Sequence, residues 1–309
     1  MDHRPTWYGI IADTNFPTEL TPWHSFMEAP PPNWQIFKQP SGLSSSAENT
    51  KNLPVGYYQR LAIGKSPEWK KVYISGEYGF ITDGKPVWPE YNDQVHCPPD
   101  KAAWPKVNPS LPIVRSYDFG LTPACIFSQI TSRGQWIVFD EIVATRMGTD
   151  SFSDTVLDHC ARWYPRCDFI DYGDPAGANA SEINETLSSF RIMHAKGIMI
   201  EPGIQTLEIR LESVRKPLRT LVDGRPQFVL HPRCSKLRRG MMGGYRFRKM
   251  RVSGERYTAS PEKDQFSHPC DALSYAGTRL FGAALYGMRP NDDQQENRSH
   301  AGRSMVTGY

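Results

Sequence analysis

Residues 113–120 have the sequence IVRSYDFG, an apolar stretch that ends in an aspartate and, two residues later, a glycine. This pattern predicts a buried strand over residues 113–118, with the carboxylate of Asp118 at the point where the strand gives way to a loop. Residues 124–131 and 135–143 are two further strand-like stretches, separated by short turns. Three consecutive strands at hairpin spacing predict an antiparallel meander.

After the meander, stretches with the helical spacing of apolar residues alternate with short strand-like stretches. A meander followed by alternating helices and strands is typical of an α/β domain, so we expect a mixed sheet flanked by helices. The expected helices are 150–164, 180–190, 206–222 and 269–285, and the expected later strands are 167–173 and 198–200.

The chain has 309 residues, of which 22% are charged and 12% aromatic, and this composition excludes a disordered polypeptide and a coiled-coil rod. The apolar run at residues 282–288 is far shorter than the roughly 18–20 residues that span a bilayer. The first five residues lack the layout of a signal peptide. We therefore expect a soluble protein without a membrane partner. Clustered prolines predict a linker and a domain boundary at residues 91–110.

Six cysteines are scattered along the chain without a CxxC pair. In a long chain without a signal peptide this favours free thiols in a reducing compartment. His159, Cys160 and Cys167 have a spacing that fits no common zinc site. The net charge of +3 is too small to indicate a nucleic-acid partner by itself, so the distribution of charge is more informative.

Three aspartates occupy positions where a strand ends or a helix begins. Asp118 ends the first strand, Asp174 follows the fourth strand in YGDPAG, and Asp271 lies in the first turn of the last helix in SHPCDALSYA. If the first and fourth strands are neighbours, their ends meet, and the helix start can bring a third carboxylate to them. Carboxylates that lie close together repel unless a cation separates them, so this set predicts a site for hard divalent metal ions. Two such ions would activate a water and stabilise the leaving oxygen of a phosphodiester.

Each of these acids also has an ordinary structural explanation. Aspartate before Gly or Pro is common in turns, and an aspartate in a first helical turn stabilises its helix. Asp171 is the alternative to Asp174, although its place inside the fourth strand favours a structural role. We expect Asp264 and His268 to be the supporting polar groups of the site.

A run of basic residues occupies positions 233–256, with nine Lys or Arg against one acid, Glu255. Aromatic residues interleave with them and glycines supply turns, as in a basic helix followed by a β-hairpin that contacts phosphates. A charged face that contacts only solvent is the alternative. The residues expected to contact DNA phosphates are Arg238, Arg239, Arg246, Arg248 and Lys249.

Six stretches of the sequence resemble the large terminase subunit of tailed bacteriophages. In chain order they are IIADTNFP (10–17), FKQPSGLSSSAENTKNLPVGYY (37–58), YISGEYG (73–79), SYDFGLTPA (116–124), DYGDPAG (171–177) and FSHPCDALSYA (266–276). The resemblance implies an RNase H-like nuclease domain over residues 111–286. In this domain two metal ions, Mg²⁺ or Mn²⁺, are expected to be held by Asp118, Asp174 and Asp271. It further implies an endonuclease that cuts concatemeric double-stranded viral DNA during genome packaging.

The same resemblance implies partners and a location. The partners are double-stranded viral DNA, the small terminase subunit and the portal protein of the capsid, and the location is the host cell cytoplasm, at the procapsid portal. Residues 287–309 are polar and without periodicity, so we expect a disordered tail that is dispensable for cutting. In the family, a tail of this kind is thought to dock on the portal.

Residues 1–90 resemble the end of an ATPase domain and its lid. The phosphate-binding pattern GxxxxGK[ST] is absent, because Gln59 stands where the first glycine would precede Gly64, Lys65 and Ser66. We therefore expect no ATP-binding residues and no ATP hydrolysis by this chain alone. The expected explanations are a truncated product, a split gene, or one half of a motor.

Two other functions are open. A resolvase or transposase would share the nuclease fold, but the ATPase-like segment at residues 37–79 argues against it. A non-catalytic fragment that binds DNA or docks on the portal would use the acids only structurally. Asparagine in place of Asp118, Asp174 or Asp271 is expected to abolish cleavage and leave the fold intact, and a metal-dependent plasmid-nicking assay separates the two classes.

Overall fold

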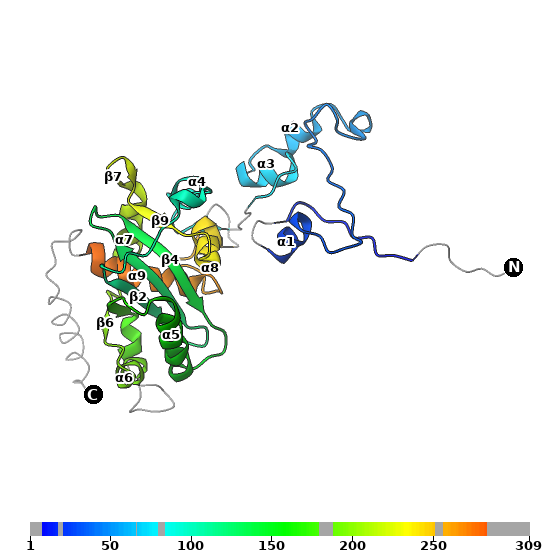
Figure 1. Cartoon of the computed structure of the whole chain (residues 1–309). Helices are drawn as coiled ribbons and strands as arrows, with labels where there is room; N and C mark the ends of the chain where they lie inside the picture. Colours follow the sequence, from blue (N-terminus) through cyan, green and yellow to red (C-terminus); the bar gives the residue numbers. More distant parts are fainter. Residues whose placement is uncertain are drawn as a thin grey trace, which may run out of the picture. The chain divides into compact units, whose positions relative to one another are not determined.

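The structure, a computed structural model, describes residues 8–17, 21–65, 67–79, 84–178, 188–250 and 256–282. Its contacts divide the chain into two compact units, with the division between Thr82 and Asp83. Figure 1 shows the helices and strands of each unit.

The first unit contains short helices joined by long turns. They are α1 (Pro22–Glu28), the 3₁₀ turn Thr50–Asn52, α2 (Tyr57–Leu61) and α3 (Pro67–Tyr73). The hydroxyl of Thr21 caps α1 by accepting a hydrogen bond from the backbone N–H of His24. The ring of Tyr78 lies against Phe16 and His24, with ring centroids 5.3 and 4.6 Å away. Aromatic packing therefore holds the two ends of this unit together.

The second unit is built on a six-stranded sheet with the order β6-β5-β2-β3-β4-β9. The strands are β2 (Ile113–Asp118), β3 (Ala124–Ile130), β4 (Trp136–Val143), β5 (Phe169–Gly173), β6 (Ile200–Pro202) and β9 (Phe228–Leu230). Strands β2, β3 and β4 are antiparallel, whereas β5 lies parallel to β2, β6 to β5 and β9 to β4. The predicted meander and the predicted mixed α/β sheet are both confirmed.

Helices cover both faces of the sheet because its central strands are apolar on both sides. One face packs on α5 (Thr149–Trp163) and α6 (Ser189–Ala195), and the other on α7 (Leu207–Arg219) and α9 (Ser267–Gly277). Helix α9 continues into a π-helical turn at Thr278–Gly282. Side chains alternate between the two cores with the strand period of two, so that Ile113 and Tyr117 join the α5 core and Val114 joins the α9 core.

Smaller elements complete the second unit. They are β1 (Lys85–Pro86), α4 (Asp93–His96), the 3₁₀ turns Lys101–Ala103 and Pro175–Ala178, β7 (Leu221–Val222), β8 (Arg225–Pro226), α8 (Ser235–Arg239), the π turn Gly240–Gly244 and β10 (Arg246–Phe247). Strand β10 pairs with β1, and Lys249 forms an isolated antiparallel bridge with Tyr257. The described part of the basic run is thus a short helix and a π turn followed by extended backbone.

The segment expected to be a linker, residues 91–110, lies within the second unit, and residues in it and just before it contact α7. Trp88 is buried in the α9 core and donates a hydrogen bond from its indole N–H to the carbonyl of Leu211, 3.0 Å away. His96 is buried too, with Nε2 3.1 Å from the carbonyl oxygen of Leu218. The prolines of residues 91–110 do produce turns, but the buried side chains around them tie the segment to α7.

Two expectations lie largely or wholly outside the described residues: the helix over 180–190, of which α6 accounts only for the last residues, and the tail at 287–309. Among the residues that the structure does describe, no helix is long and apolar enough to cross a membrane.

Candidate active site

Asp118 and Asp174 lie at the same edge of the sheet because β2 and β5 are parallel neighbours. Tyr117 is in register with Gly173, so each aspartate directly follows a paired residue. The backbone N–H of Asp174 also donates to the carbonyl of Tyr117, with a distance of 3.1 Å. The strand order therefore places two carboxylates beside each other, as the sequence predicted.

The turn after β5 fixes the orientation of Asp174. Its Oδ1 accepts a hydrogen bond from the backbone N–H of Ala176 at 3.0 Å, and its carbonyl accepts one from Gly177. The ring of Phe119 lies against Gly177, where an added Cβ would come within 2.5 Å of the ring. Phe119 also meets Phe190 of α6 edge to face, with ring centroids 5.8 Å apart. The residue after Asp118 thus packs on the turn that carries Asp174.

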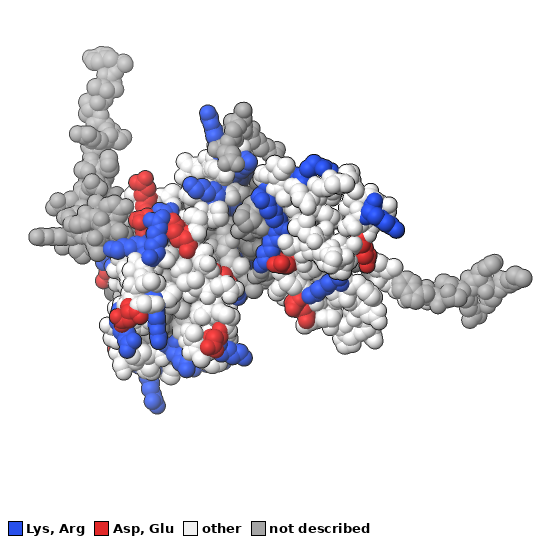
Figure 2. All heavy atoms as spheres, turned by 90° about the horizontal axis from the view of Figure 1, so that it is seen from above, with Lys and Arg blue, Asp and Glu red and all other residues white. Residues whose placement is uncertain are grey.

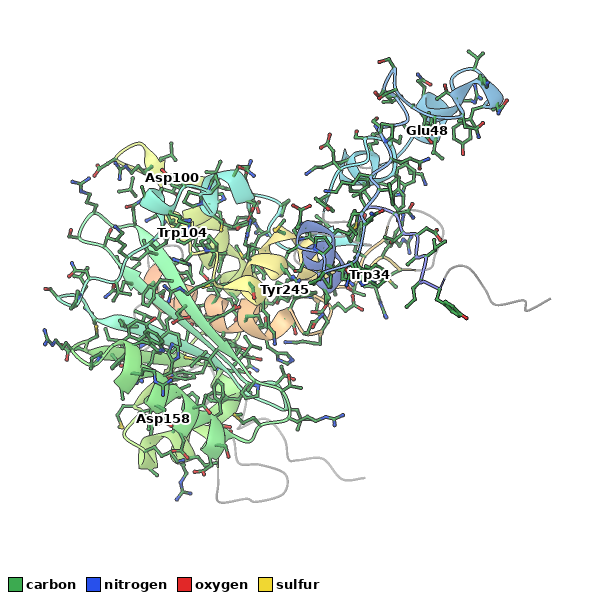
Figure 3. The ribbon with its side chains drawn as sticks, turned by 45° about the vertical axis from the view of Figure 1, so that its right-hand side comes forward. Trp34, Glu48, Asp100, Trp104, Asp158 and Tyr245 are labelled. Carbon is green, nitrogen blue, oxygen red and sulfur yellow. The ribbon has the colours of Figure 1, made fainter. Side chains whose placement is uncertain are left out.

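Asp271 lies on helix α9, which packs across β2, and its side chain is 1% exposed. Three donors from outside this helix hold its carboxylate. Its Oδ1 accepts hydrogen bonds from Arg210 Nη2 and, at 2.6 Å, from the hydroxyl of Tyr245. Its Oδ2 accepts one from Lys263 Nζ. Figure 3 labels Tyr245 beside the helices that carry these groups. Both oxygens of the third carboxylate are therefore engaged by the protein's own donors.

Arg210 is itself fixed by its surroundings. Its Nε donates to the hydroxyl of Ser274 at 3.0 Å, and its guanidinium lies 4.2 Å from the centre of the Tyr275 ring. Burial is the largest single influence and lowers the pKa of Arg210, but the charge of Asp271, together with Tyr275, Tyr245 and Asp174, outweighs it, so the pKa is raised. The pair is a buried ion pair with all its main contacts satisfied.

The three carboxylates influence one another electrostatically. Burial raises the pKa of Asp118, a hydrogen bond from His268 Nδ1 to Oδ2 at 2.8 Å lowers it, and the charges of Asp271 and Asp174 raise it again. Burial likewise raises the pKa of Tyr275, and the same three carboxylates raise it further while Arg210 lowers it. One small region therefore holds all three predicted acids.

The donor chemistry of this region suits a hard divalent cation, because its ligands are carboxylate oxygens. Nevertheless, no group of three Asp, Glu, His or Cys side chains within the described ranges lies close enough together to hold an ion as placed. Asp271 is instead engaged by Arg210, Tyr245 and Lys263, of which Lys263, with a side chain 70% exposed, is the partner at the surface.

The two supporting residues have different roles. His268 contacts Asp118 directly, as described above. Asp264 accepts hydrogen bonds from the backbone N–H groups of Phe266 and Ser267 at 2.8 and 3.2 Å, so it stabilises the start of α9. The helix that carries Asp271 is thereby anchored from its first turn.

Asp171 lies on the opposite face of the sheet, in the α5 core. Arg115 binds it with two hydrogen bonds of 2.7 Å, and the hydroxyl of Tyr117 donates a third at 3.0 Å. This buried ion pair joins β2 to β5 at in-register positions. The structural role predicted for Asp171 is confirmed, and Asp171 does not replace Asp174.

Other acids and the dismissed zinc set have clear partners. Glu141 accepts hydrogen bonds from the backbone N–H groups of Lys236 and Leu237, at the start of α8. Asp140 accepts one from the Tyr164 hydroxyl at 2.6 Å and lies 2.9 Å from His159 Nε2. His159 is therefore a partner of a carboxylate rather than a zinc ligand with the nearby cysteines.

The five basic residues proposed for DNA contact differ in their surroundings. Arg238 forms a two-point ion pair with Asp93. Arg246 lies 3.0 Å from Glu262 and 3.6 Å from Asp264. Arg239 is half-buried, and burial lowers its pKa.

Arg248 and Lys249 are exposed beyond β10. Figure 2 shows Lys and Arg side chains interspersed with Asp and Glu over the face that it draws. Of the five residues, Arg248 and Lys249 are the ones exposed to solvent.

Sequence reasoning missed the donors that hold Asp271. Arg210 had a detectable signal, because it lies between Leu207 and Leu211 on the apolar side of α7, where a charged residue requires a buried partner. Tyr245 and Lys263 carried no such signal, since their contacts depend on how the chain folds back on α9.

No family model and no curated protein sequence matches this chain. Several solved structures do match this chain. The large terminase of a thermophilic bacteriophage matches with a TM-score of 0.49 and 13% identity, over 75% of this chain and 52% of that one. This chain therefore spans about half the length of that protein.

Isolated nuclease domains match over nearly their whole length. The large-terminase nuclease domain of bacteriophage SPP1, solved with bound Mn, has a TM-score of 0.41 and 15% identity, over 58% of this chain and 94% of that one. The large-terminase nuclease of thermophilic phage G20c, solved with bound cobalt, gives a TM-score of 0.40 and 12% identity, over 62% and 97% of the two chains.

Proposed function

We propose that this chain is a metal-dependent endonuclease of a phage DNA-packaging terminase, acting on double-stranded DNA. The observation that supports the proposal is that Asp118 and Asp174 stand at two neighbouring parallel strand ends and that the charge of Asp271, on helix α9, influences the pKa of Asp118. Acids that only stabilise turns have no reason to share an electrostatic environment.

Two ions, Mg²⁺ or Mn²⁺, would be held by the carboxylates of Asp118, Asp174 and Asp271. Bound there, the ions would supply an activated water and neutralise the charge that develops on the phosphodiester oxygens. Arg210 and Tyr245 orient Asp271 through its Oδ1, which leaves Oδ2 as the oxygen available for a metal. His268 orients Asp118 in the same way, leaving Oδ1 free of any hydrogen bond from His268.

The DNA backbone would contact the exposed end of the basic run. Arg248 and Lys249 are the best-placed cations for phosphate, whereas Arg238 and Arg246 mainly hold the segment in place through Asp93, Glu262 and Asp264. Contacts of this kind position a duplex without reading its sequence.

The test is a plasmid-nicking assay with Asp118→Asn and Asp174→Asn. Both variants should lose cleavage by at least about a hundredfold in Mg²⁺ or Mn²⁺, because each removes a charged ligand. Asp168→Asn is the matched control, since this exposed aspartate precedes the same strand β5 at its other end. Circular dichroism and thermal unfolding verify the fold. Full activity of both variants, or wild-type cleavage in EDTA, would refute the proposal.

A non-catalytic DNA-binding or portal-docking module is the second candidate, and one observation favours it. Both oxygens of Asp271 are already satisfied by Arg210, Tyr245 and Lys263. Such a module would bind a plasmid in the same assay but would not nick it with either metal. The small terminase subunit and the portal protein, as partners, and the procapsid as the place of action are proposals that follow from the sequence resemblance alone.

A further inference from the structure

A cavity of about 500 Å³ lies at the end of the sheet opposite the three aspartates. It is lined by Pro109 and Cys167, which precede strands β2 and β5. Asp118 ends β2 and Asp174 follows β5, so both lie at the other end of these strands. Its volume is within the range of roughly 300–1,000 Å³ that small-molecule sites have. This hollow, which we call the rear pocket, is therefore separate from the candidate active site.

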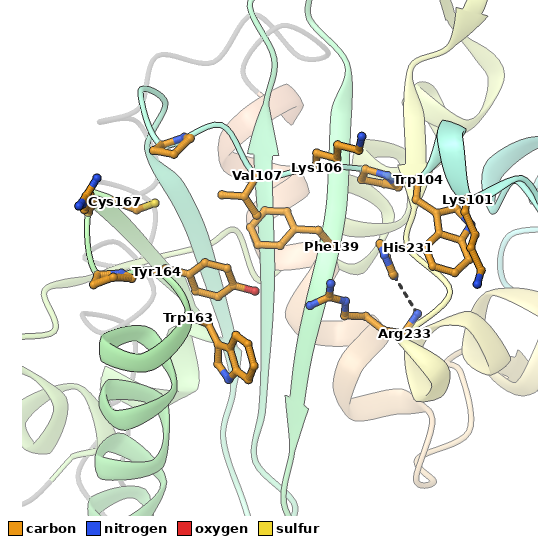
Figure 4. A pocket seen from close by; sticks show the side chains of 14 residues that line it. Lys101, Trp104, Lys106, Val107, Phe139, Trp163, Tyr164, Cys167, His231 and Arg233 are labelled. Atoms are coloured by element: carbon orange, nitrogen blue, oxygen red, sulfur yellow. Dashed lines mark hydrogen bonds between the residues drawn. The ribbon is translucent and has the colours of Figure 1, made fainter.

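Aromatic rings form the walls of the rear pocket (Figure 4). Trp163, at the end of α5, is 63% exposed, which is unusual for so large an apolar side chain. Trp104 is held by a hydrogen bond from its indole N–H to the carbonyl of Pro98 at 3.0 Å, and its ring meets that of His231 at 4.7 Å. Rings that are fixed at their edges can offer their faces to a planar ligand.

Cations surround these rings. Lys101, Lys106, Arg166 and Arg233 line the pocket, and no Asp or Glu is among the lining residues. Asp140, next to the lining residue Phe139, is bound by Tyr164 and His159, with Arg233 Nη1 3.7 Å away. Because Arg233 is paired with Asp140, the positive charge of the rear pocket comes mainly from Lys101, Lys106 and Arg166.

We propose that the rear pocket binds an unpaired nucleotide of single-stranded DNA. Its base would stack on Trp163 or Trp104, and its flanking phosphates would contact Arg166 and Lys106. A positively charged groove with aromatic side chains is the general arrangement by which proteins bind single strands. A base in a duplex cannot reach such a ring, because both of its faces are covered by its neighbours.

The experiment measures the fluorescence anisotropy of labelled (dT)10 with the full chain in EDTA, so that no cleavage occurs. Trp163→Ala should weaken binding about fivefold or more, because stacking on one base contributes that much or more to affinity. Trp163→Phe should restore most of it. Arg166→Glu with Lys106→Glu should weaken binding and lower its salt dependence. Trp23→Ala and Arg225→Glu, at exposed positions outside the pocket, are the matched controls.

Competition identifies the ligand. Unlabelled (dT)10 should displace the probe, and a duplex of equal length should displace it much less well. Three results would overturn the proposal: equal affinity for the duplex, no effect of Trp163→Ala, or displacement by thymidine monophosphate as effective as by (dT)10, which would indicate a free-nucleotide site. Displacement only by an acidic, aromatic-rich peptide would also overturn it and assign the pocket to a protein partner. The proposal is independent of the proposed nuclease, since plasmid nicking by Trp163→Ala remains a separate readout.

Discussion

The ammonium group of Lys263 lies 2.5 Å from Oδ2 of Asp271. Arg210 and Tyr245 both donate to the other carboxylate oxygen, Oδ1. Asp271 is 1% exposed, whereas the side chain of Lys263 is 70% exposed. A buried carboxylate thus has one permanent cationic partner in the core and one removable partner at the surface. In the proposed nuclease site, Lys263 would compete with a metal ion for Oδ2 of this carboxylate.

Removal of this competitor should strengthen metal binding. Lys263→Met is expected to raise the affinity for Mn²⁺ about two- to fivefold, since an ion pair with an exposed partner contributes only ~0.2–1 kcal/mol. Isothermal titration calorimetry with Mn²⁺ measures the change. Lys249→Met, at an exposed lysine beyond β10, controls for the loss of one positive charge. Equal affinities of the two variants would show that Lys263 does not compete with metal.

Asparagine substitutions of the acids should differ in their effect on stability. Asp271→Asn leaves the buried guanidinium of Arg210 without its carboxylate, so we expect a loss of about 3–5 kcal/mol. Asp118→Asn should leave stability unchanged or higher without metal, because the raised pKa of Asp118 means that its ionised form is disfavoured in the fold. Urea unfolding in EDTA measures both. Equal destabilisation of the two variants would contradict this account.

The strands of the meander, and the positions of Asp118 and Asp174 at strand ends, could be predicted from the sequence because the sequence patterns that mark them are local. The stretch 113–118 coincides with β2, and the alternation of apolar residues marks both faces. The contacts of Asp271 could not be predicted, since they join residues 61 and 26 positions apart, Arg210 and Tyr245. β9 was missed because its three residues become a strand only through pairing with β4.

Gly177 should be intolerant of any side chain. A Cβ at this position would meet the ring of Phe119 at 2.5 Å and that of Phe190 at 2.9 Å, and neither ring is a flexible chain end. Gly177→Ala should therefore displace Phe119, move Asp118 relative to Asp174, and cost about 1–3 kcal/mol as overpacking does. We expect nicking to fall more than stability explains. Gly134→Ala is the control, because Gly134 has open space around it but a positive φ. This variant should lose stability without a further loss of nicking.

The stability of the second unit should depend on pH through His96. Burial lowers the pKa of His96 from its ordinary value of 6.5, and its neutral ring accepts from the N–H of Asn92 while Nε2 faces the carbonyl of Leu218. Below about pH 6.5 the unfolded chain binds a proton that the folded ring does not, so stability is lost as pH falls towards the lowered pKa.

Thermal unfolding between pH 7 and pH 5 measures this dependence. His96→Gln should flatten the curve but not abolish the slope, because burial and Arg233 also lower the pKa of His231. His194→Gln, at an exposed histidine of the same unit, should keep the wild-type slope. A curve for His96→Gln as steep as that of the wild type would show that His96 is protonated equally in both states.

The basic run should contact DNA at its exposed end and not along its whole length. Arg248→Ala with Lys249→Ala should weaken duplex binding for all sequences alike and lower the slope of log K against log salt by about 1.8, because each phosphate contact contributes about 0.9. Arg238→Ala should instead reduce stability, since its charge is already paired with Asp93. Filter binding at several salt concentrations, with Arg225→Ala as the control, separates the two effects. The aspartates repel DNA until metal is bound, so nearby cations are needed in the first encounter. If the double variant kept the affinity and salt slope of the wild type, the basic run would be only a solvated face, and DNA would have to approach the aspartates from another side.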